Sequence, residues 1–386
     1  MNFKFDFILI SHAKPNVGTF NSFLAYAKSI CKVSSYKVAL ICPCEKNFLG
    51  IKIKKIQKNL YIITLPNFNY HKYFNLQILR LICILFILFL FKYKSILASG
   101  FSQPQICFPI TIAKIIKNVK VIYLWDDMWG NGLGNKINKF INNIFLLCEK
   151  ISFKYCDHII YPSNYFKKKI TNLKISSTKI YQPYISSNLK NNNNSNYYKR
   201  KLGIKKNSKI IVCMGNAFFD TENIILNTLN YLKKKNNFKC IFIGKFAVSE
   251  LNQIKYKKLI DENIINKGFI NDKKYFNDLM NLADIYILPM ARNIIEKSRF
   301  PVRILDYLGR NKVIVTNATG ELKNLFEKYQ IGIITNYSSY YFFKGIQKAF
   351  KINSKKKNYY ISQQKKIILK EFNFNITAQK LIKILK

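Results

Sequence analysis

The sequence of 386 residues is poor in acidic residues, since 19 Asp and Glu stand against 64 Lys and Arg and give a formal charge of +45 at pH 7. The basic residues are spread over every segment, which argues against one dedicated nucleic-acid face. Lys, Asn, Ile, Tyr and Phe are abundant together, as in a coding sequence that has drifted toward A and T. A nucleic-acid-binding protein is kept as an alternative. Whatever its origin, so positive a surface is attracted to anionic membranes.

Cysteines at the spacing of metal or redox motifs and a signal peptide are also lacking. The nine cysteines are scattered, many of them inside apolar runs, as at Cys213 and Cys240. The one close pair, Cys42 and Cys44, has a spacing unlike the usual zinc or redox motifs. The first residues, FKFDFILIS, lack the apolar core and cleavage site of a signal peptide. We therefore expect a cytoplasmic protein with reduced thiols and no structural metal.

The longest apolar run is too short to cross a membrane. It reads LICILFILFLF over Leu81–Phe91, between Arg80 and Lys92. A spanning helix needs about 20 apolar residues. We expect a buried helix here, and the alternative is a helix that lies shallowly in a membrane interface, because basic residues flank it.

The chain is long enough for two domains, and about half of its residues are hydrophobic. Alternating strand and helix patterns predict a Rossmann-like domain over residues 1–185 and another over 208–365. The polar, low-complexity stretch 186–207 between them reads as a linker. Residues 366–386 predict a terminal helix that packs back across the domains. Such alternation predicts parallel sheets with right-handed crossovers.

Apolar, β-branched runs give the expected strands. In the first half they lie at 5–10, 36–42, 61–65, 95–98, 121–125 and 157–163, and in the second half at 209–214, 240–243, 264–270, 284–288 and 313–315. The loop 290–300 is long for a connection of this kind, which favours a functional role.

A helix after this loop carries charges of both signs. Pro301 suits a first helical turn, and Arg303, Asp306 and Arg310 are spaced to share one helix face. Arg299 and Arg303 crowd the helix N-terminus, where an anion would relieve the unfavourable charge. A solvated face with an exposed Arg–Asp pair is the alternative.

The order of these motifs resembles that of the GT-B glycosyltransferases, specifically those like family 4. The second half carries IIVCMG, CIFIGKF, NKGFI, NLADIYILPM and FPVRILDYLGRNKVIVTNATGE, and the first half carries PNVGT, SILASG, VIYLWDD and YCDHIIYPSNYFKKKI. The resemblance implies a GT-B fold, in which two Rossmann-like parallel-sheet domains face each other across a cleft. It also implies transfer of a hexose or related sugar, with retention, from a nucleotide diphosphate-sugar to a hydroxyl. The acceptor would be a glycan or a lipid-linked acceptor of cell-surface polysaccharide assembly, such as lipopolysaccharide, at the inner membrane face.

The resemblance also implies a set of nucleotide-sugar contacts. Asp306 stands where the family has a glutamate that accepts hydrogen bonds from the nucleotide ribose. Lys245, Gly268 and Phe269 match positions beside the base. Gly18 and Thr19 match a glycine loop that approaches the diphosphate, where a residue without a side chain permits close backbone contact.

The chain departs from the family pattern in its second half. Ser298 stands where the family has a first glutamate, and Glu296 is the candidate replacement. Gly215 is followed by Asn216 rather than by the basic residues that usually hold the diphosphate. Gly215 and Asn216 stay candidates for donor contact, and Arg299 and Arg303 are the candidate replacements for the missing charges.

In the first half, Asp126 and Asp127 stand where a histidine often follows the strand. They are our candidates for acceptor binding or acid–base work, and a turn-forming pair is the alternative. His12, directly after the first strand, is a further candidate on the acceptor side. We expect no cofactor and no metal, because no Asp-x-Asp motif occurs. A GT-B-shaped nucleotide-sugar epimerase and an inactive transferase homologue stay as alternatives.

Overall fold

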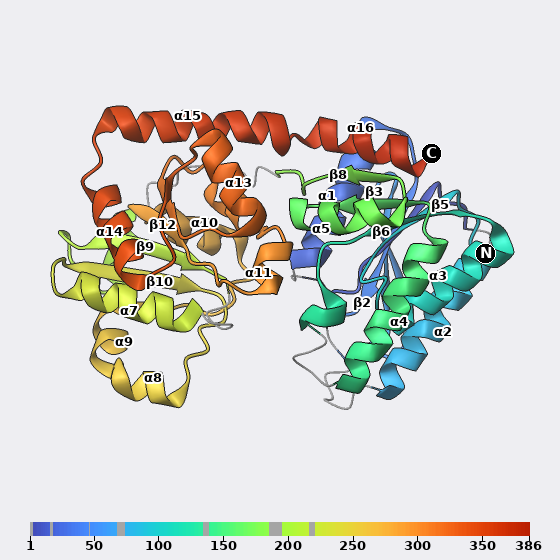
Figure 1. Ribbon diagram of the computed structural model, residues 1–386, viewed down its shortest axis with the longest axis horizontal. Helices are drawn as coiled ribbons and strands as arrows, with labels where there is room; N and C mark the ends of the chain where they lie inside the picture. The colour runs from blue at the N-terminus through green and yellow to red at the C-terminus, as the bar shows by residue number, and fades with distance from the viewer. Residues whose placement is uncertain are drawn as a thin grey trace. The chain divides into compact units, whose positions relative to one another are not determined.

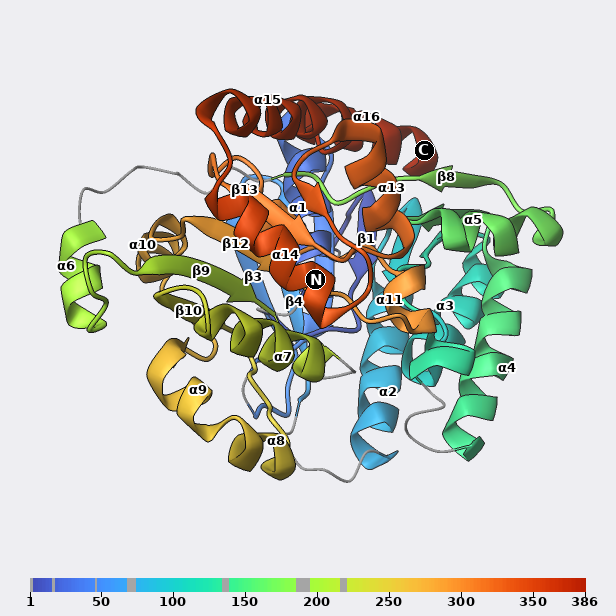
Figure 2. The same ribbon diagram turned by 60° about the vertical axis from the view of Figure 1, so that its left-hand side comes forward.

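The structure is a computed structural model that describes residues 3–15, 18–45, 47–67, 74–133, 139–184, 195–215 and 221–386. Its chain forms two compact units, each with its own sheet (Figures 1 and 2). The first comprises Met1–Ile185, Lys297–Phe300 and Glu371–Lys386, and the second comprises Ser186–Glu296 and Pro301–Lys370. The C-terminal segment therefore groups with the first unit.

The first unit contains an eight-stranded sheet in the order β3-β4-β2-β1-β5-β6-β7-β8. Neighbouring strands are parallel except for β3 and β4, which form an antiparallel hairpin at the edge. The strands are β1 (Phe7–Ile10), β2 (Val38–Pro43), β3 (Lys52–Gln57), β4 (Leu60–Leu65), β5 (Ser95–Ser99), β6 (Lys120–Leu124), β7 (His158–Tyr161) and β8 (Ser177–Lys179).

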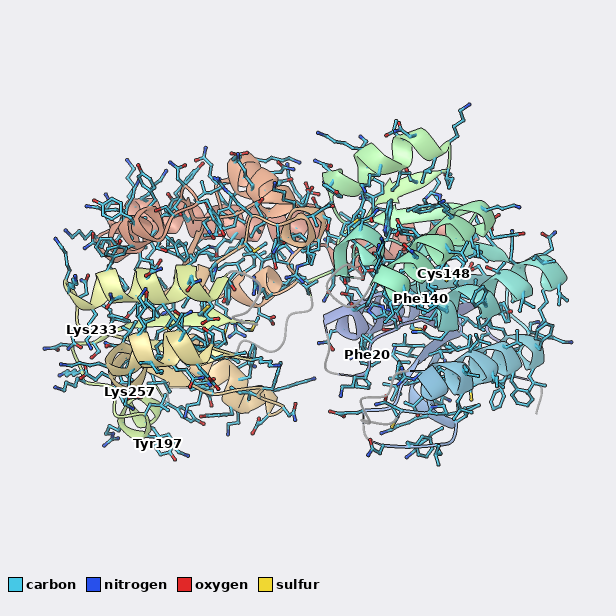
Figure 3. All side chains as sticks on the ribbon, turned by 60° about the horizontal axis from the view of Figure 1, so that its bottom comes forward. Phe20, Phe140, Cys148, Tyr197, Lys233 and Lys257 are labelled. Carbon is cyan, nitrogen blue, oxygen red and sulfur yellow. The ribbon has the colours of Figure 1, made fainter. Side chains whose placement is uncertain are left out.

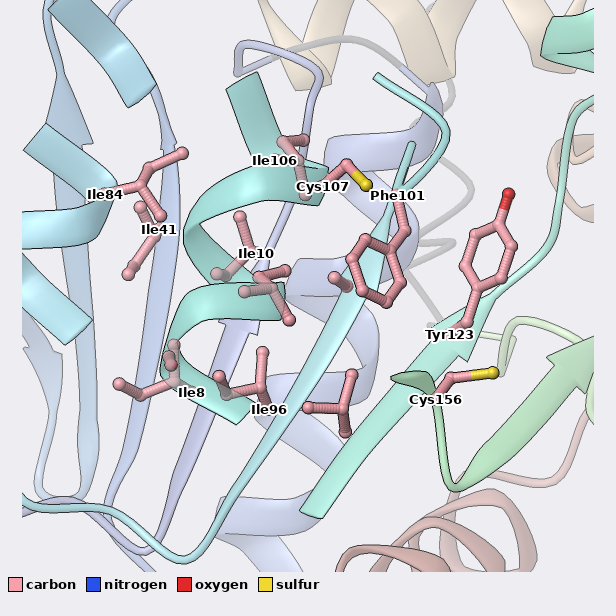
Figure 4. Packing of buried hydrophobic residues seen from close by; sticks show 14 of the residues in the cluster. Ile8, Ile10, Ile41, Ile84, Ile96, Phe101, Ile106, Cys107, Tyr123 and Cys156 are labelled. Carbon is pink, nitrogen blue, oxygen red and sulfur yellow. The ribbon is translucent and has the colours of Figure 1, made fainter. Parts of the chain in front are cut away.

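Helices cover both faces of this sheet. One face carries α1 (Gly18–Val33) and α16 (Phe374–Leu385), and the other carries α2 (Phe74–Leu90), α3 (Pro104–Lys117), α4 (Lys139–Tyr155) and α5 (Asn164–Ile170). In the core on the side of α2 to α5, Ile84 of α2 and Ile106 of α3 lie over Ile41 and Ile96 of the strands (Figure 4). The strands read as nearly continuous apolar runs because both of their faces are buried.

The second unit contains a six-stranded, fully parallel sheet in the order β11-β10-β9-β12-β13-β14. Its strands are β9 (Lys209–Met214), β10 (Phe238–Ile243), β11 (Ile264–Asn266), β12 (Ile285–Leu288), β13 (Val313–Thr316) and β14 (Ile333–Ile334). Its helices are α6 (Ser195–Lys201), α7 (Thr221–Lys233), α8 (Glu250–Lys255), α9 (Lys257–Asn263), α10 (Lys273–Asn281), α11 (Ile294–Ser298), α12 (Ile304–Tyr307), α13 (Gly320–Tyr329), α14 (Ser339–Phe350) and α15 (Ser354–Glu371). A core cluster packs α7, α9 and α14 against the sheet.

Basic side chains are distributed over the outer helices. Lys233 on α7 and Lys257 on α9 are examples (Figure 3), and both pair with acidic side chains, Glu262 and Asp261. In the regions described, none of the helices has the length and apolar character needed to cross a bilayer.

The predicted α/β fold with two parallel-sheet domains is confirmed, with local corrections. The strand β3 was missed because its sequence, KIKKIQ, is exposed along its whole length and carries no buried face. The short strand β8 follows β7, which was expected to be the last strand of its sheet. The helix α6 lies in the stretch read as a linker, and α11 lies in the loop 290–300.

The helix expected after Pro301 is much shorter than predicted. Only Ile304–Tyr307 is helical, because Leu308 has an extended backbone (φ −62°, ψ 146°) and Gly309 follows with φ 77°. The prediction that Arg303, Asp306 and Arg310 share one helix face is therefore wrong. Arg310 is 8% exposed and donates from Nη2 to Asn277 Oδ1 of α10 at 2.7 Å. Arg310 thus ties the chain to α10.

Candidate functional site

Both sheets share a strand order that favours ligand binding at one place. In the second unit β9 is followed outward by β10 and β11 on one side and by β12, β13 and β14 on the other. In the first unit β1 has β2 on one side and β5 on the other. The order reverses between β9 and β12, and between β1 and β5. In open parallel sheets, ligands bind outside the carboxyl ends of the strands at such switch points.

Arg303 occupies the switch point of the second unit. Its Nη2 donates to Pro289 O at 3.2 Å, just after β12, and its Nη1 lies 3.5 Å from Met214 O, at the end of β9. Within the ranges the structure describes, Arg303 Nε is buried and has no hydrogen-bond partner. A delocalised positive charge is thus held across the carboxyl ends of two central strands.

Gly215 provides the space for this guanidinium. A Cβ atom at Gly215 would lie 2.4 Å from Arg303 Nη1, and the residue has φ 120°, which L side chains rarely adopt. The next strand ends in a similar way at Gly244, whose Cβ would lie 2.2 Å from Gly215 O. The two glycines therefore let the chain turn closely around Arg303.

Tyr307 joins the two strands of the same switch point. Its hydroxyl accepts from Met214 N at 2.8 Å and donates to Ile287 O at 3.1 Å, which ties β9 to β12. Its ring stacks on Tyr286 with centroids 4.5 Å apart and planes at 4°. This role could not be predicted from the sequence, because Tyr307 looks like one more apolar position of its helix.

Asn317 is a second residue that the sequence reasoning missed. It is 2% exposed and follows β13 directly. Its Nδ2 donates to Met290 O at 3.0 Å, and its Oδ1 accepts from Met290 N at 2.8 Å. Asn317 thus fixes the chain where it leaves β12. A polar residue directly after an apolar strand was the available signal.

Asp306 presents its carboxyl beside this platform. The residue is exposed to solvent, so a ligand can reach it. Protein packed around it nevertheless raises the pKa of the carboxyl to about 6 by desolvation, and Arg310 acts in the opposite direction. The Asp306 carboxyl thus lies at the protein surface but is only partly hydrated.

His12 and Ser99 occupy the switch point of the first unit. His12 Nδ1 lies 3.1 Å from Ser99 Oγ, which joins the ends of β1 and β5. A Cβ at Gly100 would lie 2.8 Å from the imidazole, and Trp129 meets the ring edge-on with centroids 5.1 Å apart. Burial lowers the pKa of His12 to about 4, so the imidazole is neutral at pH 7. A neutral imidazole suits hydrogen bonding to an uncharged hydroxyl.

Asp126 and Asp127 follow β6, the next strand along the same edge, and are both half-buried. Burial raises the pKa of Asp126 well above its usual range, and the neighbouring Asp127 adds to this. The Asp126 carboxyl therefore holds a proton more readily than an exposed one. The arrangement can therefore supply both hydrogen-bond donors and acceptors at neutral pH.

Comparison with known proteins agrees with this architecture. Residues 194–367 match the family model of the glycosyl transferases group 1. A glycosyltransferase from Rickettsia africae is 14% identical with a TM-score of 0.70, and the match covers 99% of this chain and 98% of that chain. Sucrose-phosphate synthase from Thermosynechococcus elongatus is 12% identical with a TM-score of 0.72 and 98% of each chain covered. Anabaena HepE in complex with UDP-glucose is 13% identical with a TM-score of 0.69 and 99% of each chain covered.

The fold is that of the GT-B glycosyltransferases. The predicted GT-B fold is thereby confirmed. A sequence comparison with curated proteins finds no match.

The GT-B fold places several predicted residues on one edge of the second sheet. Gly215 follows β9, and Lys245 follows β10 by two residues with an exposed side chain. Gly268 accepts from Gly244 N at 2.8 Å, and the next residue, Phe269, is 73% exposed. These positions and Arg303 therefore lie at the carboxyl ends of neighbouring strands. Asn216 lies outside the described residues.

The remaining predicted residues of the GT-B chain are distributed differently. Glu296 on α11 is 4% exposed, so its carboxyl is buried within the fold. Arg299 groups with the first unit, as does Ser298, whose backbone oxygen accepts from Ser163 Oγ. Gly18 is the first residue of α1, and among the described residues no atom lies within 4 Å of the Cβ it lacks. There is thus open space beside Gly18, with the partly buried Thr19 next to it.

Glu149 is a buried acid of the first unit that was not among the residues predicted from the sequence. It is 9% exposed on α4, beneath Gly130. Burial raises the pKa of its carboxyl to about 7, while Lys169 and the Gly130 amide act to lower it. Across the described part of the chain, its Oε2 has no hydrogen-bond partner. Ionisation of the buried Glu149 carboxyl therefore lowers the free energy of unfolding as the pH rises.

We expect Glu149→Gln to be more stable than the wild type at pH 8 by roughly 2–3 kcal/mol, and nearly equal to it at pH 4.5. The folded pKa lies above the unfolded value, so the wild type loses stability as the pH rises from about 4.5 to about 7 and loses no more above that. Both tryptophans of the chain, Trp125 and Trp129, lie in this unit, so denaturant unfolding followed by their fluorescence reports on it. Glu45→Gln, which removes an exposed carboxyl, is the control for the substitution itself. A difference of equal size at both pH values would contradict the assignment.

Proposed function

We propose that this protein transfers a sugar from a nucleoside diphosphate-sugar to a hydroxyl of a glycan or lipid-linked acceptor in cell-surface polysaccharide assembly. The observation that supports it most is the Arg303 guanidinium at the switch point between β9 and β12. A guanidinium offers a planar fork that matches two phosphate oxygens. The similar HepE structure was solved with UDP-glucose.

The proposed donor site lies on the second unit. Arg303 would hold the diphosphate and stabilise the negative charge that develops on it as the glycosidic bond breaks. The exposed carboxyl of Asp306 would accept hydrogen bonds from the two ribose hydroxyls. Lys245, Gly268 and Phe269 would lie beside the base, where the exposed Phe269 ring offers a stacking surface. We propose a hexose or a related sugar as the transferred group.

The proposed acceptor contacts lie on the first unit. His12 and Ser99 would bind an acceptor hydroxyl at the first switch point, and Asp126 and Asp127 would orient the acceptor or exchange its proton. Gly18 and Thr19, at the start of α1, would approach the diphosphate. We propose retention at the anomeric centre and no requirement for a metal ion.

A transferase homologue without activity is the second candidate. Ser298 stands where the family carries its first glutamate, and it is fully buried, with its backbone bonded to Ser163. Glu296, the candidate replacement, is buried as well. Donor binding without sugar transfer would identify this case.

The direct test is a thermal-shift panel of nucleoside diphosphates and their sugars, led by UDP and UDP-glucose. A ligand at 100 times its Kd stabilises the fold by about 2.7 kcal/mol. We expect Asp306→Asn to weaken binding by about 10- to 100-fold, because a charged acceptor of two hydrogen bonds is lost. Wild-type affinity should also fall as the pH drops below about 6, where Asp306 gains a proton, and the variant should lack this dependence.

The matched control is Asp261→Asn, at an exposed carboxyl on α9 before β11, near the opposite edge of the sheet. It should bind the nucleotide as the wild type does. If no nucleotide stabilises the wild-type protein, the donor proposal fails. Unchanged affinity in Asp306→Asn would remove Asp306 from the site and leave the donor proposal standing.

A further inference from the structure

The outer side of α2 carries a stripe of exposed apolar side chains. Ile78, Ile82, Phe86 and Leu90 are 46%, 53%, 56% and 51% exposed. Their spacing of four residues puts them on one side of the helix. The other side of α2, represented by Ile84, is packed in the core of the first unit (Figure 4). The helix is therefore apolar on both sides, while the described chain covers only one of them.

The single charged residue of α2 does not shield this stripe. Arg80 Nε donates to Pro66 O at 2.9 Å, and its Nη2 donates to Asn67 Oδ1. The guanidinium is thus bound to the segment that follows β4. The apolar side chains on the outer side are left in contact with water.

The neighbouring helix α3 also exposes apolar side chains. Lys117, at the end of α3, donates from Nζ to Leu88 O at 2.7 Å and to Phe89 O at 2.9 Å. This contact fixes the C-terminal ends of the two helices side by side, as the ribbon also shows (Figure 1). Ile115 and Ile116 of α3 are 61% and 62% exposed at the same end. We call the exposed side chains at 78, 82, 86, 90, 115 and 116 the α2–α3 face.

Basic residues border the α2–α3 face, and Asp157, which reaches α3 from outside it, is paired with Lys114. No Asp or Glu occurs in the sequence between Glu45 and Asp126, a stretch that contains all of α2 and α3. Lys92, just after α2, is exposed, and Lys120, just after α3, is partly exposed. Exposed apolar groups bordered by lysines match the interface of an anionic bilayer, where acyl chains lie beneath phosphate headgroups.

We propose that the α2–α3 face binds the surface of an anionic lipid bilayer. Shallow insertion fits, since no helix among those described can cross a membrane. A second copy of this chain is a poorer partner, because a symmetric contact would bring two basic faces together. In the proposed reaction this contact would hold the first unit at the surface where a lipid-linked acceptor lies. That consequence rests on the proposed function, whereas lipid binding itself does not.

The test is sedimentation of the full chain with vesicles of neutral lipid containing about one third anionic lipid. We expect the wild type to bind them, and the triple variant Ile82→Gln, Phe86→Gln, Ile115→Gln to lose at least tenfold in partitioning. The matched control Leu251→Gln, Ile254→Gln removes two apolar side chains that are 77% and 78% exposed on α8 of the second unit. It should bind as the wild type does.

Variants that remove charge distinguish binding to anionic lipid from non-specific hydrophobic adsorption. Lys92→Gln, Lys120→Gln should weaken binding to the anionic vesicles several-fold, and raised salt should do the same. Absence of vesicle binding by the wild type, or equal loss in the triple variant and the α8 control, would overturn the proposal. So would a wild-type dimer that the triple variant dissociates without any vesicle binding. The thermal-shift panel on the same proteins tests donor binding separately, since nucleotide stabilisation should survive in the triple variant.

Discussion

Replacement of Gly244 by alanine is expected to destabilise the second unit by about 3–6 kcal/mol, a large part of the 5–15 kcal/mol that stabilises a typical domain. The new Cβ would lie 2.2 Å from Gly215 O, which belongs to the backbone and has no rotamer to escape into. Gly244 also has φ 124°, a conformation nearly restricted to glycine. Strain and overlap therefore act together at the ends of β9 and β10.

Gly268→Ala is the matched control for this prediction. Gly268 also has a positive φ of 59°, but no atom of the described residues lies within 4 Å of the Cβ it lacks, so only about 1–2 kcal/mol of backbone strain is expected. Tryptophan fluorescence does not report on this unit, because both tryptophans lie in the first one. Hydrogen exchange of the β9 and β10 amides measures the effect directly. Equal exchange in the two variants would show that Gly215 moves away at little cost.

The sequence was sufficient for the alternation of strands and helices and therefore for the fold. Apolar runs such as IIVCMG and IYIL are buried on both faces, as parallel strands are, and their periodicity identified them. Local signals also worked where the chemistry is local. Asp272, an acid directly before a helix, caps it: its side chain accepts from Lys274 N at 2.8 Å and from Tyr275 N at 3.2 Å at the start of α10.

The candidate site was harder to predict because its contacts join distant parts of the chain. Arg303 meets Met214 across 89 positions, and His12 meets Ser99 across 87. Helical periodicity grouped Arg310 with Arg303, but the backbone leaves the helix at Leu308 and turns the two side chains to different partners. Spacing predicts such pairs only while the helix continues.

For the proposed sugar transfer, replacement of Arg303 by methionine is expected to lower kcat/KM by about 10²- to 10³-fold. Removing one group that stabilises developing charge typically has an effect of this size. Methionine keeps the apolar stem and removes the charge that lies across the ends of β9 and β12. Arg303→Lys should be intermediate, because the ammonium keeps the charge and loses the planar fork. The affinity for UDP should fall with kcat/KM in both variants.

Arg303 also donates to protein carbonyls, so the experiment has to separate a contact with the ligand from a contribution to the fold. Binding of uridine, which has no phosphate, makes the separation. If Arg303 holds the diphosphate, the methionine variant loses most of its affinity for UDP and keeps its affinity for uridine within a few-fold. If Arg303 only ties Met214 to Pro289, its loss loosens the switch point and lowers the affinities for UDP and uridine to the same extent. The ratio of the two affinities therefore reports on the diphosphate contact, even where the variant melts at a lower temperature than the wild type.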